Sequence, residues 1–577
     1  MMSKTIGIDL GTNHSCMAVF SGDQPVVIPA SEGSLHTPSW VAFLPDGERL
    51  IGEAAKLQAA QNPKNTIFSV KRLLGKKFAE LEEELRNLPY QVVEDGNGNP
   101  LIRCELENGP VQYYPEQILA MILEKLKEDA QQFLNEPVSE VVVSIPTSFG
   151  VVQLEAMKDT FRIAGLQVMR MITEPVAGAL ARFPNSDDGQ TILVADVGGG
   201  SVDFSILEIA EGVYEVKAVH GEGTLGGDSW DQRIIDWMAN EFKKAHGIEL
   251  SEDPIAWQRM KLRAQSAKEI LSSKDSVEID LPDLAGKGIR ATLHRSEFES
   301  ICADLFERFK SCLTRCLKDS WISESEISSV ILMGSMYENP RIAQIIQEQI
   351  GPNSKLIASA RRDGFVAKGL AIQGAVLNGN IDDVLLLDVT SKTLSIDTEG
   401  GVATSLIERN TTIPTKKTRI FSTSITDQTE MDIVVLEGES GLSRENRIIG
   451  TLKLEGITSA SRGTPQIEVT FDIDANGILN VHAIDKDTGI EKKVQISRET
   501  ELPREKSFMQ LPISVNDKSK ISILRDGVKY GPYNEDTLRK YFAQGLISSE
   551  DQARYDGFEE WQPLKEICDW IEPISKT

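Results

Sequence analysis

The pattern of hydrophobic and polar positions divides the chain into regions with different predicted structures. Over residues 1–382, short apolar segments alternate with longer amphipathic ones, which is typical of an α/β domain. The short segments predict strands at Ile6–Asp9, Cys16–Phe20, Val141–Ser144, Ile192–Asp196, Phe204–Ile209 and Val330–Met333. The longer segments predict helices at Pro115–Leu134, Val152–Ala164, Trp230–His246, Pro254–Leu271 and Arg295–Ser320.

The period of the pattern changes after a short apolar segment, residues 383–389. In Thr429–Leu436 and in Gln466–Asp474, apolar residues occupy every second position, so that each stretch has one apolar face. A glycine turn, Ala475-Asn476-Gly477, follows the second stretch directly. These features predict an antiparallel β-sandwich domain over residues 390–498 that is separate from the α/β domain.

The C-terminal region has a third character. Residues 499–518 are polar and contain two prolines, which predicts a flexible linker. A small α+β module over 519–573 is expected to follow. Its hairpin is predicted from Ile521–Leu524 and Val528–Tyr530, and a helix capped by the preceding asparagine is predicted at Glu535–Gln544.

Charge and composition exclude several classes of protein. The net charge of −26 would repel a phosphate backbone, so binding to nucleic acid through a basic surface is not expected. The most apolar region, residues 138–153, is interrupted by Glu140 and Pro146, which predicts no membrane span. No apolar signal sequence precedes the first strand, and the cysteines show no metal-ligand spacing. The sequence therefore predicts a cytoplasmic protein with reduced thiols.

The most informative local pattern occurs twice. Residues 6–13 and 193–201 each consist of an apolar strand that ends in an aspartate, a glycine turn and the start of a second strand. Such turns bring backbone N–H groups close to an anion, and Asp9 and Asp196 could hold Mg²⁺ through water. Either hairpin alone is compatible with an ordinary glycine-rich turn. The repetition predicts two hairpins that clamp a triphosphate.

Other nucleotide-binding motifs do not fit the sequence. A strand and not a helix follows Gly198–Gly200, and the G-x-G-x-x-G pattern of dinucleotide-binding folds is absent. The P-loop pattern G-x-x-x-x-G-K-[ST] is absent as well. The predicted nucleotide site is therefore of the actin type.

Several motifs together resemble the heat-shock-70 (DnaK-type) chaperones over about residues 3–498. They are Gly7–Thr12, Val70–Leu73, Ile172–Pro175, Asp196–Ser201, Leu225–Asp228 and the segment 382–389. The resemblance implies an actin-like (ribonuclease-H-like) ATPase domain followed by a β-sandwich that binds peptides. It further implies ATP and Mg²⁺ as cofactors, and ATP-dependent binding of extended apolar segments of unfolded polypeptides. A J-domain co-chaperone and a nucleotide exchange factor are the implied partners.

The same resemblance assigns roles to single residues. Lys71 matches a lysine that orients the attacking water, Glu174 joins the metal and water network, and Asp196 holds hydrated Mg²⁺. Ser201 replaces a threonine whose hydroxyl contacts the γ-phosphate. For the polar residues near Leu271, an ordinary polar helix face is the alternative. The matched nucleotide-binding positions are Gly11, Thr12, Asn13, Gly198, Gly199, Gly200, Gly226, Gly227, Gln265, Lys268, Ser272, Gly334 and Ser335.

Some positions depart from the family pattern. Glu338 stands where the family has an arginine that stacks on the base, which predicts either weaker nucleotide binding or a base held differently by Tyr337. The Thr-Asn of the first phosphate loop is replaced by Asn13-His14. Ser148, Gly150-Val151 and Leu154 replace the Tyr, Asn-Asp and Arg that relay the nucleotide state to the peptide domain. These replacements predict altered coupling more than altered hydrolysis.

Coupling residues are nevertheless present at the domain boundary. The segment 383–388 is apolar at its centre and acidic at its ends, and in the family it docks onto the ATPase domain when ATP is bound. A buried core strand is the alternative interpretation. The residues assigned to coupling are Arg170, Leu386, Leu387 and Asp388.

Groove residues in the β domain are assigned by resemblance alone, and plain core packing is the alternative for the apolar ones. An extended client would pair its main chain with the groove and insert an apolar side chain. Glu399 and Ser424 replace the family's arch residues, which predicts an open, acidic arch. The assigned groove residues are Ile396, Phe421, Ser424, Met431 and Ile433.

The C-terminal module resembles bacterial GYF-like domains through Val528–Tyr533 and Trp561, and it stands where the family has a helical lid. Tyr530, Tyr533 and Trp561 would bind an extended partner, or else form the small core of the module. An adaptor with weak or vestigial ATPase activity that recruits a partner through this module is therefore an alternative function. A small-molecule kinase of the actin-like superfamily is a third, which the appended β domain disfavours.

Overall fold

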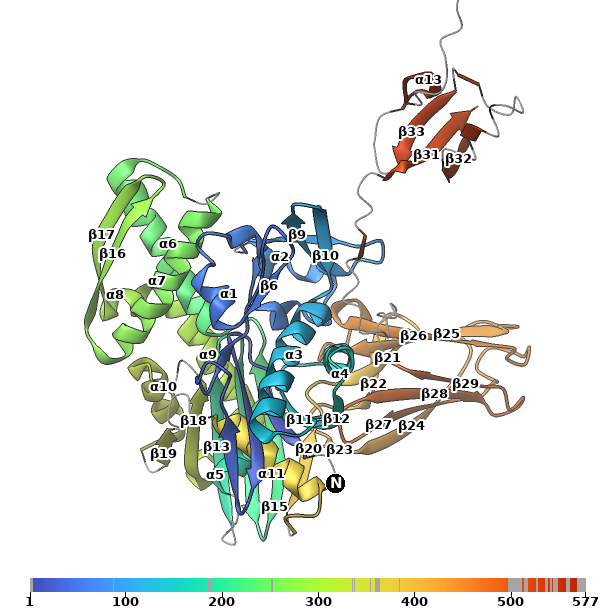
Figure 1. The fold of residues 1–577 in the computed structure, drawn as a ribbon. Helices are drawn as coiled ribbons and strands as arrows, with labels where there is room; N and C mark the ends of the chain where they lie inside the picture. The colour runs from blue at the N-terminus through green and yellow to red at the C-terminus, as the bar shows by residue number, and fades with distance from the viewer. Residues whose placement is uncertain are drawn as a thin grey trace, which may run out of the picture. The chain divides into compact units, whose positions relative to one another are not determined.

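The computed structural model describes residues 4–86, 88–183, 189–250, 253–334, 336, 338–352, 354–358, 364–382 and 384–496, together with parts of 511–567. The chain divides into two compact units. The first comprises Met1–Gly109 and Tyr113–Phe508, and the second comprises Pro110–Gln112 and Met509–Thr577. Figure 1 shows the elements of each unit.

Two mixed sheets form the centre of the α/β region (Figure 1). The first has the order β12-β11-β1-β2-β3, with β4 paired to β2. The second has the order β19-β18-β13-β14-β15-β20-β23. Strands of the first sheet are β1 Ile6–Asp9, β2 His14–Ser21, β3 Gln24–Ile28, β4 Thr37–Pro38, β11 Glu140–Ile145 and β12 Gln167–Thr173. Strands of the second are β13 Gln190–Val197, β14 Val202–Ala210, β15 Val213–Glu222, β18 Ile327–Gly334, β19 Lys355–Ala358, β20 Leu385–Val389 and β23 Thr412–Ile413.

The duplicated sequence pattern corresponds to a duplicated arrangement of strands. Strand β1 is parallel to β11 on one side and forms a hairpin with β2 on the other. Strand β13 is parallel to β18 and forms a hairpin with β14. Helices α5 (Glu174–Arg182) and α11 (Phe365–Leu377) pack together beside these strands. A Cβ at Gly369 would overlap the carbonyl oxygen of Ala177, so this close packing requires glycine.

The larger helices agree closely with the sequence prediction, with one correction. The predicted helix Arg295–Ser320 is two helices, because Cys302 leaves the helical conformation with φ −107° and ψ 10°. The long helices are α3 Pro115–Leu134, α4 Val151–Ile163, α6 Gly227–His246, α7 Pro254–Ser273, α8 Arg295–Ile301, α9 Ala303–Ser320 and α10 Pro340–Ile350. No helix within the described residues is both long and apolar enough to cross a membrane.

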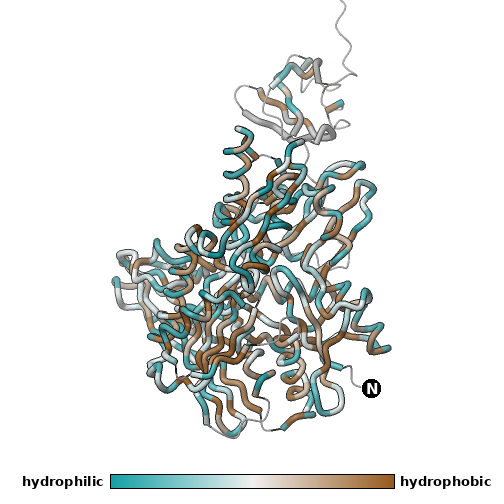
Figure 2. The backbone as a smooth tube through the Cα atoms, turned by 90° about the vertical axis from the view of Figure 1, so that its left-hand side faces the viewer, coloured by the Kyte–Doolittle hydropathy of each residue, from teal (hydrophilic) through white to brown (hydrophobic). Residues whose placement is uncertain are grey.

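Smaller elements complete the α/β region. Strands β16 and β17 form a hairpin that packs on α6 and α7. The remaining elements are β5 Val41–Phe43, β6 Arg49–Ile51, α1 Glu53–Leu57, β7 Thr66–Ile67, α2 Glu82–Leu85, β8 Gln91–Glu94, β9 Pro100–Leu106, β10 Gly109–Tyr113, β16 Ser276–Leu284 and β17 Lys287–His294. Figure 2 shows hydrophobic residues concentrated along the central strands. The core includes Trp230, which is fully buried and packs against Phe306 with ring centroids 5.8 Å apart.

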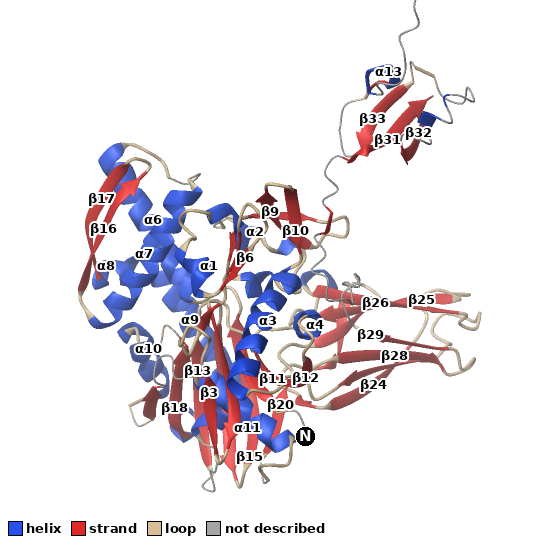
Figure 3. Ribbon diagram, in the orientation of Figure 1, coloured by secondary structure: helices blue, strands red, loops and turns tan. Residues whose placement is uncertain are grey.

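The β-rich region forms two four-stranded antiparallel sheets, with the orders β22-β21-β25-β26 and β24-β27-β28-β29. Figure 3 shows their strands in red. As the alternation predicts, Ile467, Val469 and Phe471 all point into the core of this domain. The strands are β21 Leu394–Thr398, β22 Val402–Ile407, β24 Thr415–Phe421, β25 Glu430–Glu437, β26 Arg447–Glu455, β27 Ile467–Ile473, β28 Leu479–Asp485 and β29 Glu491–Gln495.

The second unit contains a small sheet with the order β32-β31-β33-β34. The predicted hairpin lies within β31 and β32, which pair antiparallel. Most of the predicted helix Glu535–Gln544 lies outside the described residues. The Arg554 guanidinium lies 4.6 Å from the centre of the Trp561 ring. The elements are β30 Leu511–Pro512, β31 Asp517–Arg525, β32 Val528–Asn534, β33 Gln552–Asp556, β34 Gln562–Pro563 and α13 Leu564–Ile567.

Candidate nucleotide site

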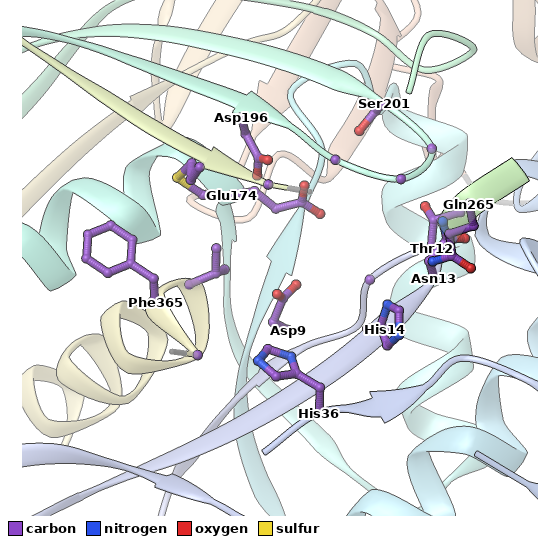
Figure 4. A pocket seen from close by; sticks show the side chains of 18 of the residues that line it. Asp9, Thr12, Asn13, His14, His36, Glu174, Asp196, Ser201, Gln265 and Phe365 are labelled. Carbon is purple, nitrogen blue, oxygen red and sulfur yellow. The ribbon is translucent and has the colours of Figure 1, made fainter. Parts of the chain in front are cut away.

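A cavity of about 200 Å³ lies between the two duplicated hairpins. Residues of the β1–β2 turn line one side and residues of the β13–β14 turn line the other, as Figure 4 shows. Helix α5 contributes Glu174 and helix α7 contributes Gln265, while Gly334 comes from the end of β18. The predicted site residues that line the cavity are Asp9, Gly11, Thr12, Asn13, Glu174, Asp196, Gly198, Gly199, Gly200, Ser201, Gln265, Lys268 and Gly334.

Glycines are required where the two turns meet. A Cβ at Gly199 would overlap the Asn13 side chain, and one at Gly200 would lie 2.5 Å from Thr12 Oγ1. The amide of Gly227 donates to the carbonyl oxygen of Gly198 over 2.8 Å, which joins the start of α6 to the second turn. The backbone can therefore approach a bound phosphate closely from both sides.

A buried ion pair lies beside the cavity. Lys71 is 3% exposed, and its Nζ lies 2.7 Å from Glu174 Oε1. The lysine lies in a short 3₁₀ turn, Val70–Leu73, and the glutamate is the first residue of α5. The amino group and the carboxylate hold each other in place, which suits groups that orient a water molecule.

Several more carboxylates are crowded into the same region. Burial, reinforced by the charge of Glu174, raises the pKa of Asp9 to about 6, and burial likewise raises the pKa of Asp203 to about 6. Burial and the neighbouring carboxylates raise the pKa of Asp196 well above its ordinary value. Asp196 Oδ1 is buried and accepts no hydrogen bond from any described residue. Hard oxygen ligands with uncompensated negative charge fit a hydrated Mg²⁺ ion.

Hydrogen bonds hold these carboxylates in fixed positions. Ser144 Oγ donates to Asp9 Oδ1 over 2.7 Å. Ser201 Oγ donates to Asp203 Oδ2 over 2.5 Å, and the amide and hydroxyl of Thr147 both donate to Asp203 Oδ1. Sequence reasoning assigned no role to Asp203. Its position two residues after Ser201 in the β13–β14 hairpin is the only signal that could have identified it.

Not all predicted nucleotide-binding residues line the cavity. Gly226 and Gly227 lie behind the second turn, and Ser272 Oγ bonds within its own helix to the carbonyl oxygen of Lys268. Lys268 does line the cavity, but its amino group is held by the protein. Its Nζ is 2.7 Å from Asp231 Oδ1 and donates to the carbonyl oxygen of Gly227 over 2.8 Å. Ser335 lies outside the described residues.

Sequence reasoning missed several residues that line the cavity, among them His36 and Phe365. His36 precedes β4, and Phe365 begins α11 (Figure 4). Neither belongs to a motif or a periodic pattern, because each reaches the cavity only through packing of segments that are distant in the chain. His14, which was noted only as a replacement in the first loop, also lines it.

The segment between the two domains forms strand β20, which pairs in parallel with β15. Leu386 is opposite Tyr214 and is 9% exposed, whereas Leu385 is 53% exposed. Asp388 is buried, and burial raises its pKa, while the nearby charge of Arg170 opposes this shift. Arg170 and Asp388, two of the residues assigned to coupling, are therefore brought close to one another beside β20.

The assigned groove residues divide into buried and accessible positions. Ile396 and Ile433 are buried, and Phe421 and Met431 are partly buried against the same core. Ser424 is exposed on the loop after β24, where its amide donates to Gln428 Oε1. Glu399, the acidic residue of the expected arch, has a cationic partner, because Arg462 Nη2 lies 2.7 Å from Glu399 Oε2.

Comparison with known proteins agrees with this arrangement. The Hsp70 protein family model matches residues 5–518. The chain belongs to the Hsp70 family. It is 47% identical over 509 residues to the chaperone protein DnaK of Akkermansia muciniphila, an alignment that covers 87% of this chain and 79% of the relative. The family resemblance found in the sequence is thereby confirmed, and so is the ATPase activity in a chaperone that it implies.

The C-terminal module of this Hsp70 is also identified. A GYF domain 2 model matches residues 523–569. Strands β32 and β33 lie within this matched region, and the last residues of β31 lie at its start. The predicted GYF-like domain is therefore confirmed at the level of the family.

Proposed function

We propose that this Hsp70 hydrolyses Mg²⁺-ATP in the cavity between the duplicated hairpins and thereby controls its affinity for extended apolar segments of unfolded polypeptides. The observation that carries the proposal is the buried ion pair of Lys71 and Glu174 beside Asp9 and Asp196. A fixed cation next to fixed carboxylates, opposite two glycine turns, suits hydrolysis of a terminal phosphate.

The chain's own residues would act by positioning and charge. Glycine turns would hold the phosphates through backbone N–H groups, with Ser201 Oγ at the terminal phosphate. Lys71 would donate a hydrogen bond to the attacking water, and Glu174 would keep the lysine oriented. Asp9 and Asp196 would hold hydrated Mg²⁺, which supplies positive charge against the phosphate oxygens when bound.

In the proposed organisation, the chain consists of five segments with different functions. Residues 1–382 form the nucleotide-binding domain, 383–389 the linker and 390–498 the peptide-binding β-sandwich, while 499–518 tether the GYF domain at 519–573. The two-sheet topology and its continuous core support the β-sandwich assignment. A client strand would place an apolar side chain against Phe421 and Met431.

The proposed clients, partners and location of this Hsp70 follow from its family and from the net charge of the chain. Clients are unfolded or extended polypeptides, and a J-domain co-chaperone and a nucleotide exchange factor would accelerate the cycle in the cytoplasm. A separate partner would bind the GYF domain. These roles require neither nucleic acid nor membrane binding, in line with the net charge of −26.

The full-length protein tests the proposal directly. ATP hydrolysis is measured with and without an unfolded peptide, in the presence of a J-domain protein. Stimulation by both is the expected result. Tight ATP binding without hydrolysis would contradict the proposal and indicate a nucleotide-gated adaptor, and phosphate transfer to a sugar would indicate a kinase.

A further inference from the structure

The junction between the ATPase and β domains contains a buried carboxylate. Glu437, the last residue of β25, is 3% exposed. Its Oε1 accepts a hydrogen bond of 2.8 Å from the amide of Val151, the first residue of α4. A carboxylate from the β domain thus satisfies one of the free N–H groups at the start of a helix in the ATPase domain.

The residue before the helix makes room for this carboxylate. A Cβ at Gly150 would overlap both carboxylate oxygens of Glu437. The backbone of Gly150, at φ −93° and ψ 178°, is one that any residue adopts. Glycine is therefore needed at this position for space and not for its conformational freedom.

The contact depends on the two domains remaining together. Glu437 Oε2 accepts no hydrogen bond from the described residues, and Lys392 Nζ lies 3.6 Å away. A buried carboxylate with few partners is stable only while the α4 amide faces it, whereas water solvates both groups after separation. Val151 and Leu154 extend the junction, since Val151 packs into the β-domain core and Leu154 lies against Gly477.

The same junction is connected to the phosphate turn through hydrogen bonds. Ser201 in that turn donates to Asp203 over 2.5 Å, and Asp203 accepts two hydrogen bonds from Thr147. Thr147 lies three residues before Gly150, so a displacement of the Ser201 hydroxyl would reach the start of α4 through a short, packed segment.

We propose that Glu437, Gly150 and the Val151 amide form a latch that holds the β domain on the ATPase domain, and that Asp203 and Thr147 connect this latch to the phosphate turn. Glu437 is a positioning residue in this arrangement, because it touches no nucleotide. The proposal deepens the coupling part of the proposed function. Gly150 and Val151, which replace two of the family's relay residues, thus still contact the β domain, because Glu437 of that domain supplies a carboxylate to them.

Hydrogen–deuterium exchange on the full-length protein, with and without ATP, tests the latch. Glu437→Ala and Gly150→Ala should each speed exchange of the amides in 149–155 and 384–389 about tenfold, which is typical of a lost hydrogen bond to a buried charge. Glu430→Gln is the matched control at the exposed start of the same strand, and it should leave exchange unchanged. Wild-type exchange rates in Glu437→Ala would overturn the proposal.

A double variant separates a latch from a merely structural role. The Cβ of Gly150→Ala displaces the Glu437 carboxylate, and Glu437→Ala removes the same carboxylate, so both changes break one contact. Exchange in the double variant should therefore lie within about twofold of exchange in either single variant. Additive damage in the double variant would overturn the latch. Absence of ATP hydrolysis by the wild type would count against the proposed function alone, since the latch is also measured without nucleotide.

Discussion

Lys71 and Glu174 form a buried ion pair 2.7 Å long, although 103 residues separate them in the chain. The pair joins the 3₁₀ turn at Val70–Leu73 to the first turn of α5. Both groups lie where Asp9 and Asp196 concentrate negative charge. In the proposed mechanism, this pair orients the attacking water.

Replacement of Lys71 by alanine should lower ATP hydrolysis in a single turnover by at least about 100-fold, the usual cost of losing a positioned charge. The lysine charge also lowers the pKa of Asp9 and of Asp196, so its loss would raise both further. Lys64→Ala is the control, since Lys64 is exposed. Hydrolysis at the wild-type rate in Lys71→Ala would refute the assignment.

The raised pKa values of Asp9 and Asp203, each about 6, predict a pH dependence. These carboxyls bind protons more readily in the folded protein than in the unfolded chain. Their contribution to the stability of the ligand-free protein is therefore present below about pH 4 and is lost as the pH rises through about 6. Mg²⁺ competes with the proton on Asp9, so the rise in Tm caused by Mg²⁺-ATP should be larger at pH 7.5 than at pH 5.5. Thermal unfolding with and without Mg²⁺-ATP at both values measures this, and an equal rise would contradict it.

Adjacent leucines in β20 should differ in their effect on docking of the linker. Leu386 is 9% exposed and Leu385 is 53% exposed. Truncation of Leu386 to alanine should cost about 2 kcal/mol of docking free energy, because apolar contacts are lost and a cavity is left. Leu385→Ala should cost less than about 0.5 kcal/mol. Proteolytic cleavage within 384–389 compares the two, and equal cleavage would show that the strand is not docked as described.

The exposed ion pair of Glu399 and Arg462 should slow release of a bound peptide only modestly. Their side chains are 61% and 60% exposed, so the pair is worth at most about 1 kcal/mol. Arg462→Ala should therefore speed release by no more than about fivefold, and the difference should vanish in about 1 M salt. Release of a fluorescent peptide is the measurement, with Lys416→Ala, on strand β24, as the control. Slower release from Arg462→Ala would show that the pair hinders binding.

The sequence by itself determined the local elements and the chemical identity of the phosphate turns. Strand Ile6–Asp9 and helix Pro115–Leu134 are found with the predicted bounds, because periodicity and terminal residues act over a few positions. The break at Cys302 was missed, since the apolar pattern continues through it and only packing of α8 and α9 as separate helices reveals it.

Only the tertiary structure decided which distant residues meet. His36 became a site residue through the placement of the segment before β4, which has no sequence signature. Asp203 lies in the predicted hairpin, but only the structure shows that its carboxylate meets Ser201 and Thr147. The Glu437 carboxylate against Gly150 is likewise invisible in the sequence, where 286 residues separate Glu437 from Val151. Such contacts depend on the relative placement of whole elements and domains, which short-range periodicity does not encode.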